Sequence, residues 1–194
     1  EHRVALSIQV GQPIENIEAD LRHLRKVSEH FPTRQAQIHL LYADLYEHLG
    51  EYRRELAEAQ QALQLYRAVH DLQGEARALL ECSLASYYLG DFATAYTGFE
   101  QVVQIATDPE NRLGALENLA LLSRKIGDLP KAQYYLKEAL QLATEQGVLE
   151  HESDLWYTRG SLEWQSGSYQ DAVNSFRRAA EICHTAGDQY GMAY

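Results

Sequence analysis

Five glycines recur at almost even spacing along the chain. They are Gly11, Gly50, Gly90, Gly127 and Gly167, and successive pairs are 39, 40, 37 and 40 residues apart. A fixed period of roughly 20–50 residues is the sequence signature of solenoids, propellers and other repeat arrays. The spacing therefore restricts the chain to a series of similar units, and the residues between the glycines decide which kind.

The segments on both sides of each glycine have a helical pattern. Residues 35–49 carry apolar side chains three and four positions apart, and residues 53–69 repeat this pattern after Gly50, as amphipathic helices require. Glycine readily takes the left-handed conformation that ends a helix. Pro130 suits a first helical turn, where no backbone donor is needed. Each repeat is therefore predicted to be a two-helix hairpin, and the fold class is all-α.

Alignment on the last four glycines shows columns in which the side chain is restricted. Small residues in these columns let two helices approach closely, and large ones fill the space between hairpins. Glu55 is the one charged member. Counted from each glycine, the columns are Ala43, Ser83, Ala120 and Gly160 (seven before), Glu55, Ala95, Ala132 and Ala172 (five after), Ala59, Phe99, Leu136 and Phe176 (nine after), and Ala62, Val102, Ala139 and Ala179 (twelve after).

These columns resemble the tetratricopeptide repeat, most closely in the copy around Gly167. The residues at family positions in that copy are Trp156, Gly160, Gly167, Tyr169, Ala172, Phe176 and Ala179. The copy departs from the family at Arg159, where Leu is usual, and at Glu163, where an aromatic is usual; an earlier copy departs at Glu55. The resemblance implies a right-handed superhelical array, an α-solenoid of antiparallel helix hairpins.

We expect residues 1–194 to form a single array of such repeats. The boundaries are a degenerate repeat over 1–33, repeats over 34–71, 72–108, 109–148 and 149–187, and the start of a further helix over 188–194. The period exceeds the family's usual 34 residues, and the extra residues are expected in the links between hairpins, as at 70–78. Long repeats of this kind resemble those of bacterial transcription regulators and signalling adaptors. The array is expected to continue beyond Tyr194, or else to end where order ends.

Charge and composition exclude several classes of function. Lys and Arg number 17 and Asp and Glu 28, so the formal net charge is −11, which opposes general binding to a phosphate backbone. No apolar run approaches the ~20 residues of a membrane span, and no signal peptide is present. We expect a cytoplasmic chain without nucleic-acid or membrane partners. Cys82 and Cys183 lie far apart and are predicted to be reduced, buried thiols.

No motif for chemistry is present in the sequence. It contains no dinucleotide or Walker phosphate loop, no HExxH, no calcium loop and no GxSxG. The eight histidines are scattered over different hairpins, and His23 with His30 would give only two ligands, too few for a zinc site. We predict no catalytic residues, no metal site and no cofactor.

Stacked hairpins present a concave surface that repeat proteins use for binding. In the family, six positions of each first helix line this groove, and the resemblance carries them over copy by copy. The candidate partner-binding residues are Arg77, Leu80, Leu84, Tyr87, Tyr88, Asn118, Leu121, Arg124, Lys125, Tyr157, Ser161 and Trp164; further groove positions include Gln37, Leu40, Leu41, Asp44, Glu47, His48 and Glu81. Family members that capture acidic tails use Lys, Arg and Asn there, and only Arg77 and Asn118 fit that pattern.

The resemblance thus implies a non-catalytic module that binds a protein or peptide, as a regulatory or sensor segment of a larger bacterial protein. The aromatic and aliphatic groove residues favour a helix or extended peptide with apolar anchors. Trp164 is predicted to contact the ligand, and Trp156 to pack within its hairpin. Packing against the next hairpin remains an alternative for Tyr87 and Tyr88. Two other functions stay open: self-association through the exposed ends of the array, and small-molecule sensing.

Overall fold

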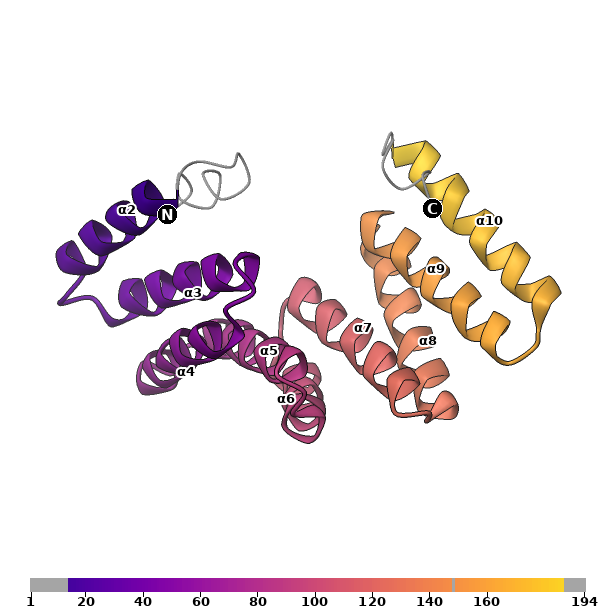
Figure 1. Ribbon diagram of the computed structural model, residues 1–194, viewed down its shortest axis with the longest axis horizontal. Helices are drawn as coiled ribbons and strands as arrows, with labels where there is room; N and C mark the ends of the chain where they lie inside the picture. Colours follow the sequence, from indigo (N-terminus) through magenta and orange to yellow (C-terminus); the bar gives the residue numbers. More distant parts are fainter. Residues whose placement is uncertain (1–13, 148, 187–194) are drawn as a thin grey trace. The chain divides into compact units, whose positions relative to one another are not determined.

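The computed structural model describes residues 14–147 and 149–186, and within these ranges every regular element is an α-helix (Figure 1). The chain divides into two compact units, Glu1–Asn111 and Arg112–Tyr194, and each is described by itself. The predicted helix start at 188–194, and the degenerate repeat up to residue 13, lie outside the described residues. None of the described helices is long and apolar enough to cross a membrane.

The first unit stacks its helices in chain order. The helices are α2 (Ile14–Val27), α3 (Pro32–His48), α4 (Tyr52–Ala68), α5 (Leu72–Tyr88) and α6 (Phe92–Ile105). Helix α4 packs against both α3 and α5, which also touch each other, and α6 packs on α5. Helices α3 and α5 therefore share one layer, and α4 packs against both of them from a second layer.

The second unit repeats this arrangement. Its helices are α7 (Pro109–Lys125), whose first turn precedes the division, α8 (Leu129–Gln146), α9 (Leu149–Gln165) and α10 (Tyr169–Ala186). Helix α9 packs against α8 and α10. His151 Nδ1 of α9 lies 2.9 Å from Glu117 Oε1 of α7. This contact joins α7 and α9, the first helices of two successive hairpins.

The predicted helix ends are confirmed at four of the recurrent glycines; Gly11 lies outside the described residues. The left-handed conformation, with φ between 69° and 84°, occurs at Gly50, Gly90, Gly127 and Gly167. In two copies an aspartate follows directly and caps the next helix: the Asp91 carboxylate accepts from the Thr94 N–H, and the Asp128 carboxylate from the Lys131 N–H, each at 3.2 Å. A Gly-Asp pair thus ends one helix and starts its partner.

The expectation that the extra residues form links is wrong at 70–78. Helix α5 already begins at Leu72, because the Asp71 carboxylate accepts a hydrogen bond of 3.0 Å from the Gly74 N–H. Gly74 lies inside the helix, where a Cβ atom would overlap the ring of Tyr66. Its lack of a side chain serves close packing rather than a turn, so the long period lengthens helices here.

The restricted columns lie where helices meet. All four residues of the column five after glycine are fully buried, and the column seven before it is buried throughout. Phe99, Val102 and Leu136 fill the adjacent space. Cys82 and Cys183 are free and buried, as predicted. The one charged member of these columns, Glu55, is also fully buried.

Replacement of Gly127 by Ala should lower the free energy of unfolding by about 1–2 kcal/mol, since a left-handed backbone is strained for residues with a Cβ. A Cβ at this position meets no atom within 4 Å, so the cost is conformational alone. Gly127→Asn should lose less, because asparagine tolerates this conformation. Urea unfolding followed by helical circular dichroism measures both variants. Equal stability of Gly127→Ala and the unmodified chain would contradict the assignment.

Candidate functional site

The twelve predicted partner-binding residues fall on three helices in two units. Five lie on α5 in the first unit, and seven lie on α7 and α9 in the second. None of them is buried. Those classed as exposed are Arg77, Tyr88, Lys125, Tyr157 and Trp164; the others are half-buried. All twelve side chains are accessible to a partner to some degree, and each unit carries its own set.

In the first unit the accessible aromatic surface centres on Tyr88. Its ring is 47% exposed and stacks on Tyr52 of α4, with centroids 4.5 Å apart and 13° between the ring planes. Tyr87 meets Tyr88 edge-on at 5.5 Å and Phe92 of α6 at 5.7 Å. Tyr87 thus helps to join α5 and α6, whereas Tyr88 presents a ring that Tyr52 holds in place.

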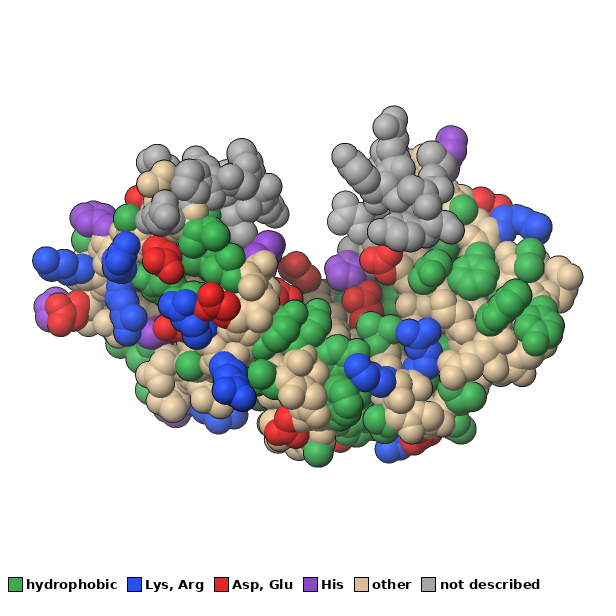
Figure 2. Space-filling view, viewed as in Figure 1, with side chains coloured by type: hydrophobic (Ala, Val, Ile, Leu, Met, Phe, Trp, Pro, Cys, Tyr) green, Lys and Arg blue, Asp and Glu red, His purple; other side chains and the backbone are tan. Residues whose placement is uncertain are grey.

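In the second unit hydrophobic side chains gather over α9 and α10 (Figure 2). Trp164 is 59% exposed and packs edge-on against Tyr169 at 5.0 Å. Tyr157, also exposed, lies 5.4 Å from Phe176. The exposed indole of Trp164 is thus supported by a second ring. Trp156, by contrast, is half-buried.

The polar candidates of the second unit bond within their own helices. The Asn118 amide donates to the Gly114 carbonyl at 2.8 Å, and the Ser161 hydroxyl donates to the Tyr157 carbonyl at 3.0 Å. Arg124 and Lys125 occupy the last turn of α7, where cations interact favourably with the helix dipole. The apolar candidates are therefore the stronger part of this surface.

A cavity of about 590 Å³ lies between α8 and α9. Its wall combines apolar side chains with charged ones: Leu136, Leu140, Trp156, Leu162, Lys137, Glu145, Arg159 and Glu163, besides Gln133, Gln141 and Thr144. The Arg159 guanidinium lies 5.0 Å from the Trp156 ring centre, and its Nε donates to Glu163 at 2.8 Å. The two departures from the family pattern, Arg159 and Glu163, thus form an ion pair on this wall.

A second cluster, which we call the acidic cluster, consists of Asp44 and Glu47 on α3, Glu55 on α4 and Glu81 on α5. Asp44, Glu47 and Glu81 occupy predicted groove positions and are half-buried. Two other predicted groove residues in this part of the chain, Leu40 and Leu41, are buried and unavailable to a partner. The accessible groove positions in this part of the chain therefore include carboxylates but neither of these two leucines.

Glu55 lies deepest in the acidic cluster. Its side chain is fully buried, and neither carboxyl oxygen has a hydrogen-bond partner. Burial, and then the negative charges of Glu47, Glu81 and Asp44, raise its pKa to about 8. Burial of a charge without a partner is costly, so the carboxyl holds its proton instead.

The same forces act on the other members. Burial, Asp44 and Glu47 raise the pKa of Glu81 to about 8, and burial also raises the pKa of Asp44. Arg77 lies 3.7 Å from Asp44 and opposes both shifts. One exposed arginine thus faces an excess of carboxyl groups.

In the sequence, Glu55 is a departure from the repeat pattern with no role predicted for it. The signal was available: a carboxylate in a column otherwise made of alanine, with acids at the groove positions of two successive repeats. What the sequence lacked was the distance between these acids, which belong to three different helices.

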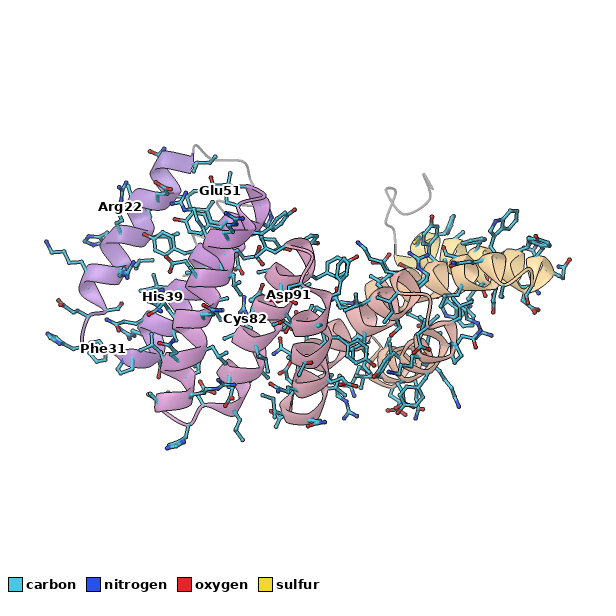
Figure 3. All side chains as sticks on the ribbon, turned by 60° about the horizontal axis from the view of Figure 1, so that its bottom comes forward. Arg22, Phe31, His39, Glu51, Cys82 and Asp91 are labelled. Carbon is cyan, nitrogen blue, oxygen red and sulfur yellow. The ribbon has the colours of Figure 1, made fainter. Side chains whose placement is uncertain are left out.

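In the described part of the chain, no three His, Cys, Asp or Glu side chains are placed to hold a metal ion. His39 of α3 pairs with Glu58 of α4 at 2.5 Å, and Figure 3 marks its place in the first unit. Figure 3 also marks Cys82, next to Glu81 on α5. Burial raises the pKa of the Cys82 thiol to about 12, which makes it a poor nucleophile.

The repeats are similar to those of known proteins. Residues 111–185 match the model of the tetratricopeptide repeat family. The chain is 24% identical over 127 residues to the photosystem I assembly protein Ycf3 of Prochlorococcus marinus (strain MIT 9303), an alignment that covers 65% of this chain and 73% of that protein.

Solved structures with the same fold include two Rap proteins. The apo form of RapI superposes with a TM-score of 0.82 at 13% identity, over 96% of this chain and 70% of that one. A Rap protein complexed with competence and sporulation factor gives 0.81 at 16% identity, over 98% and 54%. The chain therefore spans about half the length of this second structure.

The acidic cluster predicts a pH-dependent stability. The folded chain keeps a proton on Glu55 up to about pH 8, whereas an ordinary glutamate loses it near 4.5. Between these values the folded state binds more protons than the unfolded state. The free energy of unfolding should therefore fall as pH rises, by up to about 1.4 kcal/mol per pH unit for each such group.

Glu55→Gln removes this contribution, so it should match the unmodified chain at pH 5 and exceed it in stability at pH 8.5. Urea unfolding across this range measures the difference. Glu29→Gln, at an exposed position, is the control and should run parallel to the unmodified chain. If Glu55→Gln also runs parallel, the buried carboxyl does not titrate as described.

Proposed function

We propose that this chain, a tetratricopeptide repeat protein, is a non-catalytic module that binds a protein or peptide through the accessible faces of α5, α7 and α9. The observation that carries the proposal is the pair of exposed aromatic side chains, Tyr88 and Trp164, each supported by a second ring. Rigid, half-exposed aromatics are typical binding anchors, because they bury much area at little entropic cost.

The similar proteins support a protein or peptide as the partner. One Rap structure is a complex with competence and sporulation factor, another Rap regulator is bound to the Phr* peptide, and Ycf3 is named as an assembly protein. On this basis we propose a regulatory or sensor segment of a larger bacterial protein. The absence of a catalytic motif from the sequence agrees with a binding role.

The side chains also indicate what the partner offers. In the second unit, Tyr157 and Trp164 are exposed on α9 and Leu121 is accessible on α7. In the first unit, Leu80, Leu84 and Tyr88 are accessible on α5. Such surfaces fit apolar anchors spaced along a helix or extended peptide. Because each unit has its own set, the two faces are tested separately.

Peptides selected from a random phage-displayed library against the unmodified chain provide ligands for this test. Trp164→Ala and Tyr88→Ala should each weaken binding of a ligand that contacts the substituted side chain by about 2 kcal/mol, roughly 30-fold in affinity. The double variant should abolish binding. Tyr134→Ala, an exposed tyrosine on α8, is the matched control. Calorimetry measures affinity, and circular dichroism verifies folding. Unchanged affinity in the folded double variant would overturn the proposal.

The cavity between α8 and α9 favours a second function, recognition of a small molecule. Its volume of about 590 Å³ lies in the range of small-ligand sites, roughly 300–1,000 Å³. Leucines and an indole offer apolar contact, and the charged side chains of the wall, Lys137 and Arg159 against Glu145 and Glu163, balance in number. An amphiphilic aromatic molecule is the ligand class that this wall fits.

The dye 1-anilinonaphthalene-8-sulfonate belongs to this class. In a Trp164→Phe chain, Trp156 is the sole tryptophan, so saturable energy transfer from it to the dye would report binding at the cavity. Leu140→Phe, which reduces the volume of the cavity, should lower the affinity for the dye severalfold. Tyr134→Phe on the same helix should leave this affinity unchanged. No saturable transfer, or equal affinity in both variants, would contradict a small-molecule site here.

A further inference from the structure

The acidic cluster in the first unit contains more carboxyl groups than the fold itself needs. The other copies of the Glu55 column hold alanine, which packs there without charge. A carboxylate at this position costs desolvation energy and receives no hydrogen bond. Its structural role would be served better by alanine, so the carboxylate indicates a ligand rather than a packing requirement.

The surroundings of Glu55 specify the charge of that ligand. Asp44 and Glu47 face it from α3, and Glu81 faces it from α5. All three are half-buried, so they form the accessible side of the cluster. Arg77 is 3.7 Å from Asp44, and His48 also acts on Asp44. The carboxyl groups outnumber the cations that act on them, so the cluster is suited to a cation from outside, which would favour their ionised forms.

The Tyr88 hydroxyl lies within electrostatic range of the same cluster. Burial, then the charges of Glu47 and Tyr52, and then Glu55, raise the pKa of Tyr88. Its exposed ring is held in place by its stacking on Tyr52. Carboxylates beside an aromatic face suit a guanidinium better than an ammonium, because arginine both pairs with carboxylate in two hydrogen bonds and stacks on rings.

A chelated metal ion fits the cluster less well. No three acidic, histidine or cysteine side chains among residues 14–147 and 149–186 are placed to hold one. A single organic cation needs no such geometry, since its N–H groups spread over several oxygens.

We propose that the acidic cluster, together with the Tyr88 ring, binds an arginine side chain of the partner, with Glu55 as the buried carboxyl group that ionises when Asp44, Glu47 and Glu81 receive the arginine. This inference rests on the proposed function, since the arginine belongs to the protein or peptide that the chain binds. It adds the chemistry of one recognition point, in the first unit alone.

Binding of arginine at the acidic cluster is coupled to the release of protons. Glu55 and Glu81 hold protons near neutral pH, because their pKa values are about 8. An arriving guanidinium stabilises the ionised carboxylates and lowers these pKa values, so protons pass to the buffer. The groups that set the response are Asp44, Glu47 and His48 on α3, Tyr52 and Glu55 on α4, and Arg77, Glu81 and Tyr88 on α5. Affinity should therefore rise with pH between 6 and 8.5.

The test uses three acetylated and amidated peptides of sequence Leu-Leu-Xaa-Leu-Leu, in which Xaa is arginine, its neutral analogue citrulline, or lysine. Titration calorimetry of the full chain should show about tenfold or tighter binding of the arginine peptide than of the citrulline peptide. In two buffers of different ionisation enthalpy the observed heats should differ, which reports proton release. A purely structural role for Glu55 would give no such difference.

Variants locate the site. Glu81→Gln, Glu55→Gln and Asp44→Asn should each remove most of the preference for arginine, and Glu55→Gln should also reduce proton release. Arg77→Gln should strengthen the binding of the arginine peptide, because it removes the cation of the chain itself that lies beside Asp44. Asp20→Asn, an exposed charge on α2, is the control and should change nothing. Circular dichroism confirms that each variant is folded.

Several outcomes overturn the proposal. The first is equal binding of the arginine and citrulline peptides, and the second is equal binding of the arginine and lysine peptides. The third is a preference for arginine that survives Glu81→Gln and Asp44→Asn. The fourth is saturation of the cluster by Ca²⁺ or Mn²⁺ alone that depends on its carboxylates. If the phage-selected peptides still depend on Tyr88 or Trp164 in that case, the proposed function stands and only the arginine site fails. Loss of all peptide binding would remove both.

Discussion

Close packing between helices is the constraint on which the rest of this structure depends. Two helices of a hairpin can approach only where the side chains between them are small, and the buried columns of Ala, Ser and Gly satisfy this condition in copy after copy. Gly160 shows how tight the contact is, since a Cβ there would lie 2.7 Å from the Phe176 ring. The recurrent glycines then reverse the chain, so that each pair of helices can meet.

Glu55 violates this constraint, and the violation is the most informative feature of the first unit. A carboxyl group occupies a place where three other copies have a methyl group, and it lies there without a partner. Proteins keep such costly groups mainly where they serve a function. The neighbouring acids on α3 and α5 are half-buried, so a partner can reach the acidic cluster from the surface.

The two units differ in what they offer. The first combines the acidic cluster with one stacked aromatic pair, Tyr52 and Tyr88. The second has an aromatic surface around Trp164 and a cavity beside Trp156. Copies of one repeat thus provide similar backbones, while the residues at the variable positions give each copy its own chemistry.

Much of the fold was predictable from the sequence, because helices and turns depend on local rules. The period of the glycines, the three- and four-residue spacing of apolar side chains and the small columns determine helices, turns and hairpins within about forty residues. The prediction failed at 70–78, which was expected to be a link because the period is long. Asp71 caps helix α5 there, and the ring of Tyr66, from the preceding helix, lies where a side chain of residue 74 would be.

The sequence by itself therefore determined the all-α class and the hairpin repeat, because each follows from nearby residues. Only the tertiary structure decided which of those residues meet. It brought Asp44, Glu47, Glu55 and Glu81 from three helices into one acidic cluster. It also left Glu55 unpaired and placed Trp156 beside a cavity. Burial and electrostatic coupling depend on distances between helices, and a linear pattern does not contain those distances.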